Sequence, residues 1–202
     1  MLLTWLCLSF IGLGGINNSM SYNDSVYNGK LIEKVIQTGN CLKIDKDVKA
    51  YFVPFKKDDV YNFTFIVEGE LRAYPNIENW PIIGRSYQNF IEFSNSSHIT
   101  INGSGRIDGE GWIWWKYALM NKLAYNRPNL VVFDNCSDIF IDKITLSNSP
   151  QYHLNMKEVG NVLVEYVVIY VNTTEQNRIG GFPLFPLNTD GIDISGKDVT
   201  IK

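Results

Sequence analysis

The chain has 202 residues, of which 45% are hydrophobic and 19% are charged, with a formal net charge of -3 and a pI near 5.4. This length and composition fit one globular domain with a sizeable core and exclude a low-complexity chain. The sequence contains no basic run, which excludes a nucleic-acid-binding surface, so an anionic sugar would be bound only through locally placed Lys and Arg side chains.

The N-terminal residues form an apolar run with no charged side chain before Asp24. The run is too short to span a bilayer, which needs about 20 residues. We therefore expect residues 1–20 to be a secretory signal peptide and residues 21–202 to be the mature domain. A buried N-terminal strand or helix is the alternative. No later segment is apolar enough to cross a membrane, so we expect a secreted protein, extracellular or in a cell wall.

Cysteines and glycosylation sequons add little to this picture. Loss of Cys7 with a signal peptide would leave Cys41 and Cys136, and the sequence leaves open whether these two pair. The sequons are compatible with a secreted glycoprotein, although an Asn-rich chain also produces them by chance. They begin at Asn17, Asn23, Asn62, Asn95, Asn102, Asn135 and Asn172.

A strand–turn–strand pattern recurs along the chain. Residues 89–101 align without a gap with residues 129–141, and residues 153–164 fall into the same register. In each copy an apolar strand is followed by a polar turn and by a strand with apolar residues at alternate positions. These alternate positions are Ile99 and Ile101, Ile139 and Ile141, and Val162 and Val164. A shorter fourth copy begins at Ile192.

A repeat of about 23 residues with several short alternating strands has the size of one coil of a parallel β-helix. We therefore predict an all-β fold in which parallel coils stack and apolar side chains form inward columns. A β-sandwich or barrel is the alternative. Two insertions interrupt the repeat, one with a helical turn between Gly109 and Leu123 and one from Glu175 to Phe185. Insertions at coil corners commonly build the walls of a cleft.

Four segments resemble glycoside hydrolase family 28, the polygalacturonases. They are Gly105–Gly111 followed by Trp114 and Trp115, Arg127–Phe133, Leu146–His153 and the Asn-Thr-Asp-Gly-Ile-Asp run Asn188–Asp193. The resemblance covers about Asn62 to the last residue. It implies a right-handed parallel β-helix of the pectin-lyase type and hydrolysis of α-1,4-galacturonosyl bonds in pectin by an inverting mechanism.

The family also carries a pair of adjacent aspartates, a Gly-His-Gly segment and an Arg-x-Lys segment, all of which follow the Asn-Thr-Asp-Gly-Ile-Asp run. None of them occurs before the last residue, Lys202. On the resemblance we therefore expect a β-helix that is incomplete at its C-terminus, and we expect residues 1–202 alone to show no useful polygalacturonase activity.

The resemblance makes Asp190 the carboxylate that holds and deprotonates the attacking water. An inverting glycosidase needs two carboxyl groups about 6.5–9.5 Å apart, and neighbouring coils about 4.8 Å apart can supply them. The internal alignment places Asp190 in a polar column with Tyr152, Asn129 and Asn89. A plain Asx-turn before Gly191 is the alternative. Because Asp190 has the same parity as the inward-pointing Ile192, a bulge or turn at Gly191 must rotate it outward.

Three further residues are candidate substrate-binding residues. Asn188 precedes Asp190 and is placed either to bind it or to cap the turn. Asp193 should face solvent, where it either lines the cleft or is an ordinary solvated strand residue. His153 either reaches a sugar carboxylate or is a turn histidine without a ligand. Trp112, Trp114 and Trp115 are expected to pack in the core rather than to stack on a sugar.

We expect a pectic polysaccharide as the substrate, no nucleic-acid or membrane partner, no cofactor, no metal and a monomeric protein. Two other functions stay open. The first is a non-catalytic β-helix that binds acidic polysaccharide. The second is a pectate lyase, which would need a calcium-binding cluster of carboxylates and an arginine base. The sequence shows no such cluster.

Overall fold

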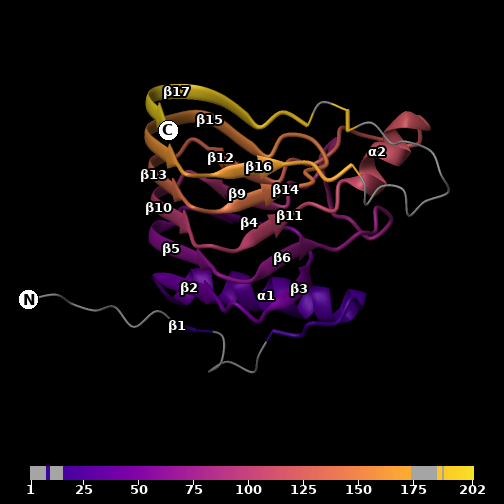
Figure 1. Ribbon diagram of the computed structural model, residues 1–202, viewed down its shortest axis with the longest axis horizontal. Helices are drawn as coiled ribbons and strands as arrows, with labels where there is room; N and C mark the ends of the chain where they lie inside the picture. Colours follow the sequence, from indigo (N-terminus) through magenta and orange to yellow (C-terminus); the bar gives the residue numbers. More distant parts are fainter. Residues whose placement is uncertain (1–7, 10–15, 174–185, 188) are drawn as a thin grey trace, which may run out of the picture.

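A computed structural model describes residues 8–9, 16–173, 186–187 and 189–202. The described chain winds into stacked coils with one helix beneath the first coil and a second helix at the side (Figure 1). Each coil contributes strands to three faces, and every strand of these faces pairs in parallel with its counterpart in the next coil.

The first and second faces join into one sheet because β15 and β17 each run through both. The first face consists of β4 (Phe55–Asp58), β9 (Ile91–Ser94), β12 (Val131–Asp134) and the first parts of β15 (Leu154–Glu165) and β17 (Ile192–Ile201). The second consists of β1 (Leu8–Ser9), β2 (Cys41–Ile44), β5 (Tyr61–Val67), β10 (Ser97–Asn102), β13 (Ser137–Asp142) and the later parts of β15 and β17.

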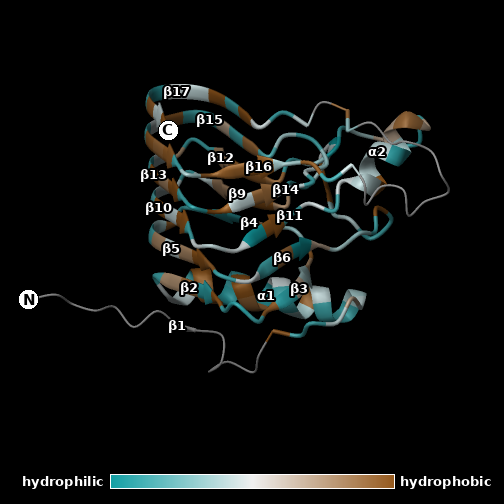
Figure 2. Cartoon of the chain, viewed as in Figure 1, coloured by the Kyte–Doolittle hydropathy of each residue, from teal (hydrophilic) through white to brown (hydrophobic). Residues whose placement is uncertain are grey.

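The third face is a separate sheet. It consists of β3 (Lys49–Phe52), β6 (Glu70–Ala73), β11 (Arg106–Asp108), β14 (Thr145–Ser147) and β16 (Val168–Tyr170). Hydrophobic and hydrophilic residues alternate along the coils, as a sheet with one buried surface requires (Figure 2).

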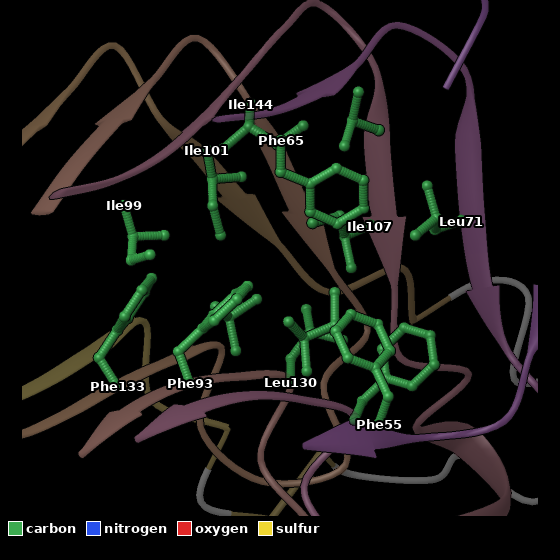
Figure 3. Packing of buried hydrophobic residues seen from close by; sticks show 14 of the residues in the cluster. Phe55, Phe65, Leu71, Phe93, Ile99, Ile101, Ile107, Leu130, Phe133 and Ile144 are labelled. Carbon is green, nitrogen blue, oxygen red and sulfur yellow. The ribbon is translucent and has the colours of Figure 1, made fainter. Parts of the chain in front are cut away.

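The inward columns agree with the sequence prediction. Ile99 pairs with Ile139 and Ile139 with Val162, and all three side chains are at most 2% exposed. On the first face Phe93 lies against Phe133, with ring centroids 5.7 Å apart and the rings 15° from parallel (Figure 3). The parallel pairing and these columns confirm the β-helix and exclude the antiparallel alternatives.

Helix α1 (Tyr22–Thr38) covers the N-terminal end of the solenoid and was not predicted. Ser21 caps it by accepting a hydrogen bond from the Asp24 backbone N–H at 3.1 Å. Its buried side includes Leu31, Ile32 and Val35, spaced as an amphipathic helix requires. Most of the predicted signal peptide, residues 1–20, lies outside the described residues, so cleavage there stays a prediction.

Three corners connect the three faces, and two of them contrast in length. The short corner joins the first face to the second and carries a left-handed residue in successive coils, Asn95, Asn135 and Glu158, with φ of 51°, 53° and 53°. Asn135 Nδ2 donates to Asn95 Oδ1 at 2.8 Å across the coils. Cys136 at this corner is a free, buried thiol, so it does not pair with Cys41.

The long corner joins the third face to the first face of the next coil. Its described residues are 53–54, 74–90, 109–130, 148–153, 171–173, 186–187 and 189–191. It holds the antiparallel hairpin of β7 (Ile82–Ile83) and β8 (Ser86–Tyr87) and the helix α2 (Trp112–Leu119). Helix α2 confirms the predicted helical turn. Trp114 and Trp115 are 1% and 0% exposed, which confirms that they pack in the interior.

Candidate active site at the long corner

A column of polar residues runs along the end of the long corner. The Phe90, Leu130 and His153 backbone N–H groups donate at 3.0 Å to the carbonyls of Asn129, Tyr152 and Asp190, which stacks these residues in successive coils. Asn89 Oδ1 accepts from the Asn129 N–H at 3.0 Å, and Asn129 Oδ1 accepts from the Tyr152 N–H at 3.1 Å. The register predicted for Asp190 is therefore confirmed. In each coil below it, hydrogen bonds from the next coil fix the backbone of the column.

The Asp190 side chain is exposed, while its backbone carbonyl is bound twice. The carbonyl accepts from the His153 N–H at 3.0 Å and lies 3.1 Å from His153 Nδ1. Strand β17 begins at Ile192, so the inward parity of Ile192 does not extend to Asp190. The turn before the strand therefore leaves the carboxylate in solvent without needing a bulge inside β17.

His153 lies in the interior with 0% exposure, which does not match a residue that reaches a sugar. Its Nε2 accepts from the Ser149 backbone N–H at 3.3 Å, so the ring proton sits on Nδ1, which donates to the Asp190 carbonyl. Burial lowers the pKa of His153 and keeps the ring neutral. Both ring nitrogens are used within the protein, and the geometry assigns His153 to holding the Asp190 backbone.

A buried carboxylate, Asp108, lies at the end of β11, one coil below the segment that carries His153. Asp108 is 1% exposed and accepts from Ser147 Oγ at 3.1 Å, Asn148 Nδ2 at 2.9 Å and the Glu110 backbone N–H at 2.9 Å. Asn148 Oδ1 in turn accepts from the Asn172 N–H at 2.8 Å. Asp108 was not among the predicted site residues. Extending the sequence repeat to the third face would have aligned Asp108 with Ser147, which pair between β11 and β14.

The Asn-Ser-Pro turn is anchored to the insertion between Gly109 and Asn129. Trp115 Nε1 lies 3.2 Å from the carbonyls of Ser149 and Pro150, and Arg127 Nη1 donates to the Pro150 carbonyl at 2.7 Å. Two of the segments that carry the family resemblance are thus in contact with the segment that presents His153. The insertion fixes the turn and, through His153, the Asp190 backbone.

Asp193 points outward from β17 and is exposed, as its parity predicts. Its Oδ2 accepts from Asn155 Nδ2 at 3.1 Å, and the two residues pair in register between β15 and β17. Asn155 Oδ1 is buried without a hydrogen-bond partner. Asn188, the remaining predicted site residue, lies outside the described residues. The structure therefore places Asp190 and Asp193 on one exposed edge and His153 beneath it.

The arrangement offers an exposed carboxylate on a rigidly held backbone, which suits a base that positions water. Among the described residues, no group of three or more His, Cys, Asp or Glu side chains is placed to hold a metal ion. None of the helices in the described part of the chain has the length and apolar character of a bilayer-spanning helix.

The model of the family described as glycosyl hydrolases family 28 matches residues 42–202, which contain the whole Asp190 column. The chain belongs to this family. The probable polygalacturonase of Vitis vinifera is 25% identical over 96% of this chain and 44% of its own length. The polygalacturonase QRT2 of Arabidopsis thaliana is 32% identical over 62% of this chain and 27% of its own length. The chain thus spans less than half of the length of either relative.

Among solved structures, the endo-xylogalacturonan hydrolase of Aspergillus tubingensis matches with a TM-score of 0.71. It is 24% identical in sequence, and the match covers 85% of this chain and 45% of that one. At this identity the likeness concerns the fold alone. Together with the parallel coil pairing, it confirms the predicted right-handed parallel β-helix.

Proposed function

We propose that the protein carrying these residues hydrolyses α-1,4-galacturonosyl bonds in pectin or polygalacturonan, with inversion, and that Asp190 activates the water. Membership of family 28 supports the reaction class, and the names of the two plant relatives support the substrate. The single observation that carries the role of Asp190 is its geometry: an exposed carboxylate whose backbone carbonyl is held by two hydrogen bonds.

In an inverting hydrolase, one carboxylate deprotonates a water while a second carboxylic acid protonates the leaving oxygen on the other side of the bond. The base must stay in place while the water attacks, because small displacements of a catalytic group are costly. Asp190 meets this need through its backbone, which His153 ties to the preceding coil. Its side chain stays free to face the water.

We assign His153 a positioning role and Asn188 and Asp193 contacts to the sugar. The Asp193 carboxylate would repel the carboxylate of a uronate, so its proposed partners are sugar hydroxyl groups, which donate to it. The hydrogen bond from Asn155 fixes the orientation of Asp193 for such a contact.

The place of action that we propose is outside the cell, in or near a cell wall, after cleavage of residues 1–20. The apolar N-terminal run and the sequons support this proposal. N-terminal sequencing of secreted protein is expected to begin near Ser21, and recovery of intact Met1 from the secreted material would overturn it.

Hydrolysis of polygalacturonate, followed by reducing-end release, tests the proposed function. The assay uses a protein that also carries the later family segments, because residues 1–202 alone are expected to be inactive. In that protein Asp190→Asn is expected to lower kcat by about 10²–10⁴-fold, the usual contribution of a general base. Asp198→Asn is the matched control, because Asp198 is an exposed aspartate of β17 that lies beside the short corner and away from Asp190. Equal rates in wild type and Asp190→Asn would refute the role of Asp190. Product absorbing at 235 nm would indicate β-elimination and refute hydrolysis.

A further inference from the structure

A pocket of about 280 Å³ opens in the long corner beside the Asn-Ser-Pro turn. Its wall is formed by the end of α2, the segment that follows α2, and Gln151. Gln151 immediately precedes Tyr152, which stacks directly below Asp190 in the polar column. The pocket is therefore one rung away from the proposed catalytic carboxylate, and its volume suits a single sugar ring better than a larger ligand.

The wall of this pocket includes Arg127, whose guanidinium forms no ion pair with the described residues. Arg127 is half-buried, and within the described residues no carboxylate lies within ion-pair distance of its guanidinium. One N–H donates to the Pro150 carbonyl at 2.7 Å, which orients the group, and the described residues give the other N–H groups no further hydrogen bond. Burial lowers the pKa of Arg127. A bound anion would offset this desolvation.

The remaining wall of the pocket has groups that suit a sugar. Tyr125 offers an aromatic face and is held edge-to-face by Tyr87, with ring centroids 5.9 Å apart. Tyr87 is itself packed on the buried Trp114 at 4.9 Å, so the aromatic wall is rigid. The side-chain amides of Asn126 and Gln151 supply both donors and acceptors for hydroxyl groups.

We propose that this pocket is a subsite for one uronate residue of an acidic pectic chain, with the Arg127 guanidinium on the uronate carboxylate. Guanidinium and carboxylate form paired, charge-assisted hydrogen bonds, and a methyl ester or a neutral sugar cannot form them. The inference rests on the proposed function for the identity of the polymer. It adds a contact next to Asp190 that selects free acid over ester.

Calorimetric titration of trigalacturonate and of its methyl ester into residues 1–202 carrying Asp190→Asn tests the subsite without turnover. The acid is expected to bind about tenfold more tightly than the ester, as one charge-assisted contact implies. Arg127→Gln is expected to weaken binding of the acid about tenfold and leave binding of the ester unchanged. Arg127→Lys keeps the charge but not the paired geometry and is expected to fall between the two.

Arg85→Gln is the matched control, because it removes an exposed cation from the β7–β8 hairpin without altering the pocket wall, and it is expected to bind like the parent. Equal affinity for acid and ester, or an Arg127→Gln variant that binds the acid as the parent does, would overturn the subsite. The acid–ester comparison needs no substitution at Arg127 and holds even if Arg127→Gln folds poorly. Asp190-dependent hydrolysis with no role for Arg127 would leave the proposed function standing and refute the subsite alone.

Discussion

The short corner and the long corner of this β-helix solve different problems. The short corner repeats nearly the same backbone from coil to coil, with Asn95 and Asn135 in the left-handed conformation that Asn tolerates well. The long corner differs in every coil, from residues 148–153 to residues 109–130. Its order comes from polar contacts between residues about 40 positions apart, such as Asp108 with Asn148.

This difference teaches where chemistry can be placed on a solenoid. The short corner is fixed by local conformation and by the columns on either side, and it leaves little freedom for a reactive group. The long corner is fixed by side chains that replace strand pairing, so its residues can be selected for contacts with a ligand. Asp190, His153 and Arg127 all lie in the long corner.

The largest expected loss of stability follows from removing Asp108, the buried acceptor of three hydrogen bonds in the long corner. Asp108→Ala leaves the Ser147 hydroxyl, the Asn148 amide and the Glu110 N–H without their buried acceptor. We expect the free energy of unfolding to fall by about 3–5 kcal/mol. Urea denaturation measures this loss. Asp58→Ala is the control, because that carboxylate is 51% exposed, and it should change stability by at most about 0.5 kcal/mol. A small loss in Asp108→Ala would mean that the long corner does not depend on the network.

A smaller loss of unfolding free energy is expected at the short corner. There, two substitutions of Asn135 separate the cost of the left-handed backbone conformation from the loss of the hydrogen bond. Asn135→Ala and Asn135→Gly both remove the bond to Asn95, but only Ala is strained at a φ of 53°. We expect Asn135→Ala to be about 1 kcal/mol less stable than Asn135→Gly in urea denaturation. Equal stability of the two variants would show that the left-handed conformation does not govern this corner.

The smallest expected effect is on the pH dependence of the unfolding free energy, to which His153 in the long corner contributes. Burial lowers the pKa of His153 in the folded protein, against a weaker opposing effect of its hydrogen bond with the Asp190 backbone, while the unfolded value stays near ~6.5. The unfolded chain then binds more protons, so this contribution to stability is present above pH ~6.5 and is lost as the pH falls through the folded pKa. Unfolding free energies at two pH values, about 5.5 and 7.5, should differ less in His153→Asn than in wild type.

His98→Asn controls for the other histidine, whose side chain is 52% exposed and lies beyond the short corner. It shows whether the loss of a histidine outside the long corner changes the pH dependence. If His153→Asn and wild type respond alike to pH, His153 is not held neutral as the geometry of its two ring nitrogens implies.

The parts of the fold that could be predicted are those that repeat. Ile99, Ile139 and Val162 stand at equal positions in aligned segments, so period and alternation alone place them in one column. Helix α1 was not predicted because it occurs once, so no repeated segment reveals it. Its capping serine, Ser21, was within reach of sequence reasoning.

Prediction of the site was less complete for a physical reason. The register of Asp190 and the outward position of Asp193 follow from the repeat, and the structure agrees with both. The exposure of Asp190 does not follow from its parity and needed a turn before Ile192 as well. The surroundings of His153 do not follow, because its burial depends on how Ser149, Tyr152 and Asp190 stack over different coils. Asp108 was not among the predicted site residues, since nothing local in the sequence reveals that three donors converge on it.

The unequal lengths of the long corner have a consequence for how such a protein can change. Residues 109–130 and residues 148–153 connect equivalent strands, and yet β12 and β15 pair without a register shift over Val131–Asp134. Lengthening a loop here alters neither the columns nor the pairing of the strands that flank it. New pocket walls can therefore be gained, lost or exchanged between relatives at little cost to folding, which makes this side of the solenoid the place where preferences for differently decorated polysaccharides can diverge.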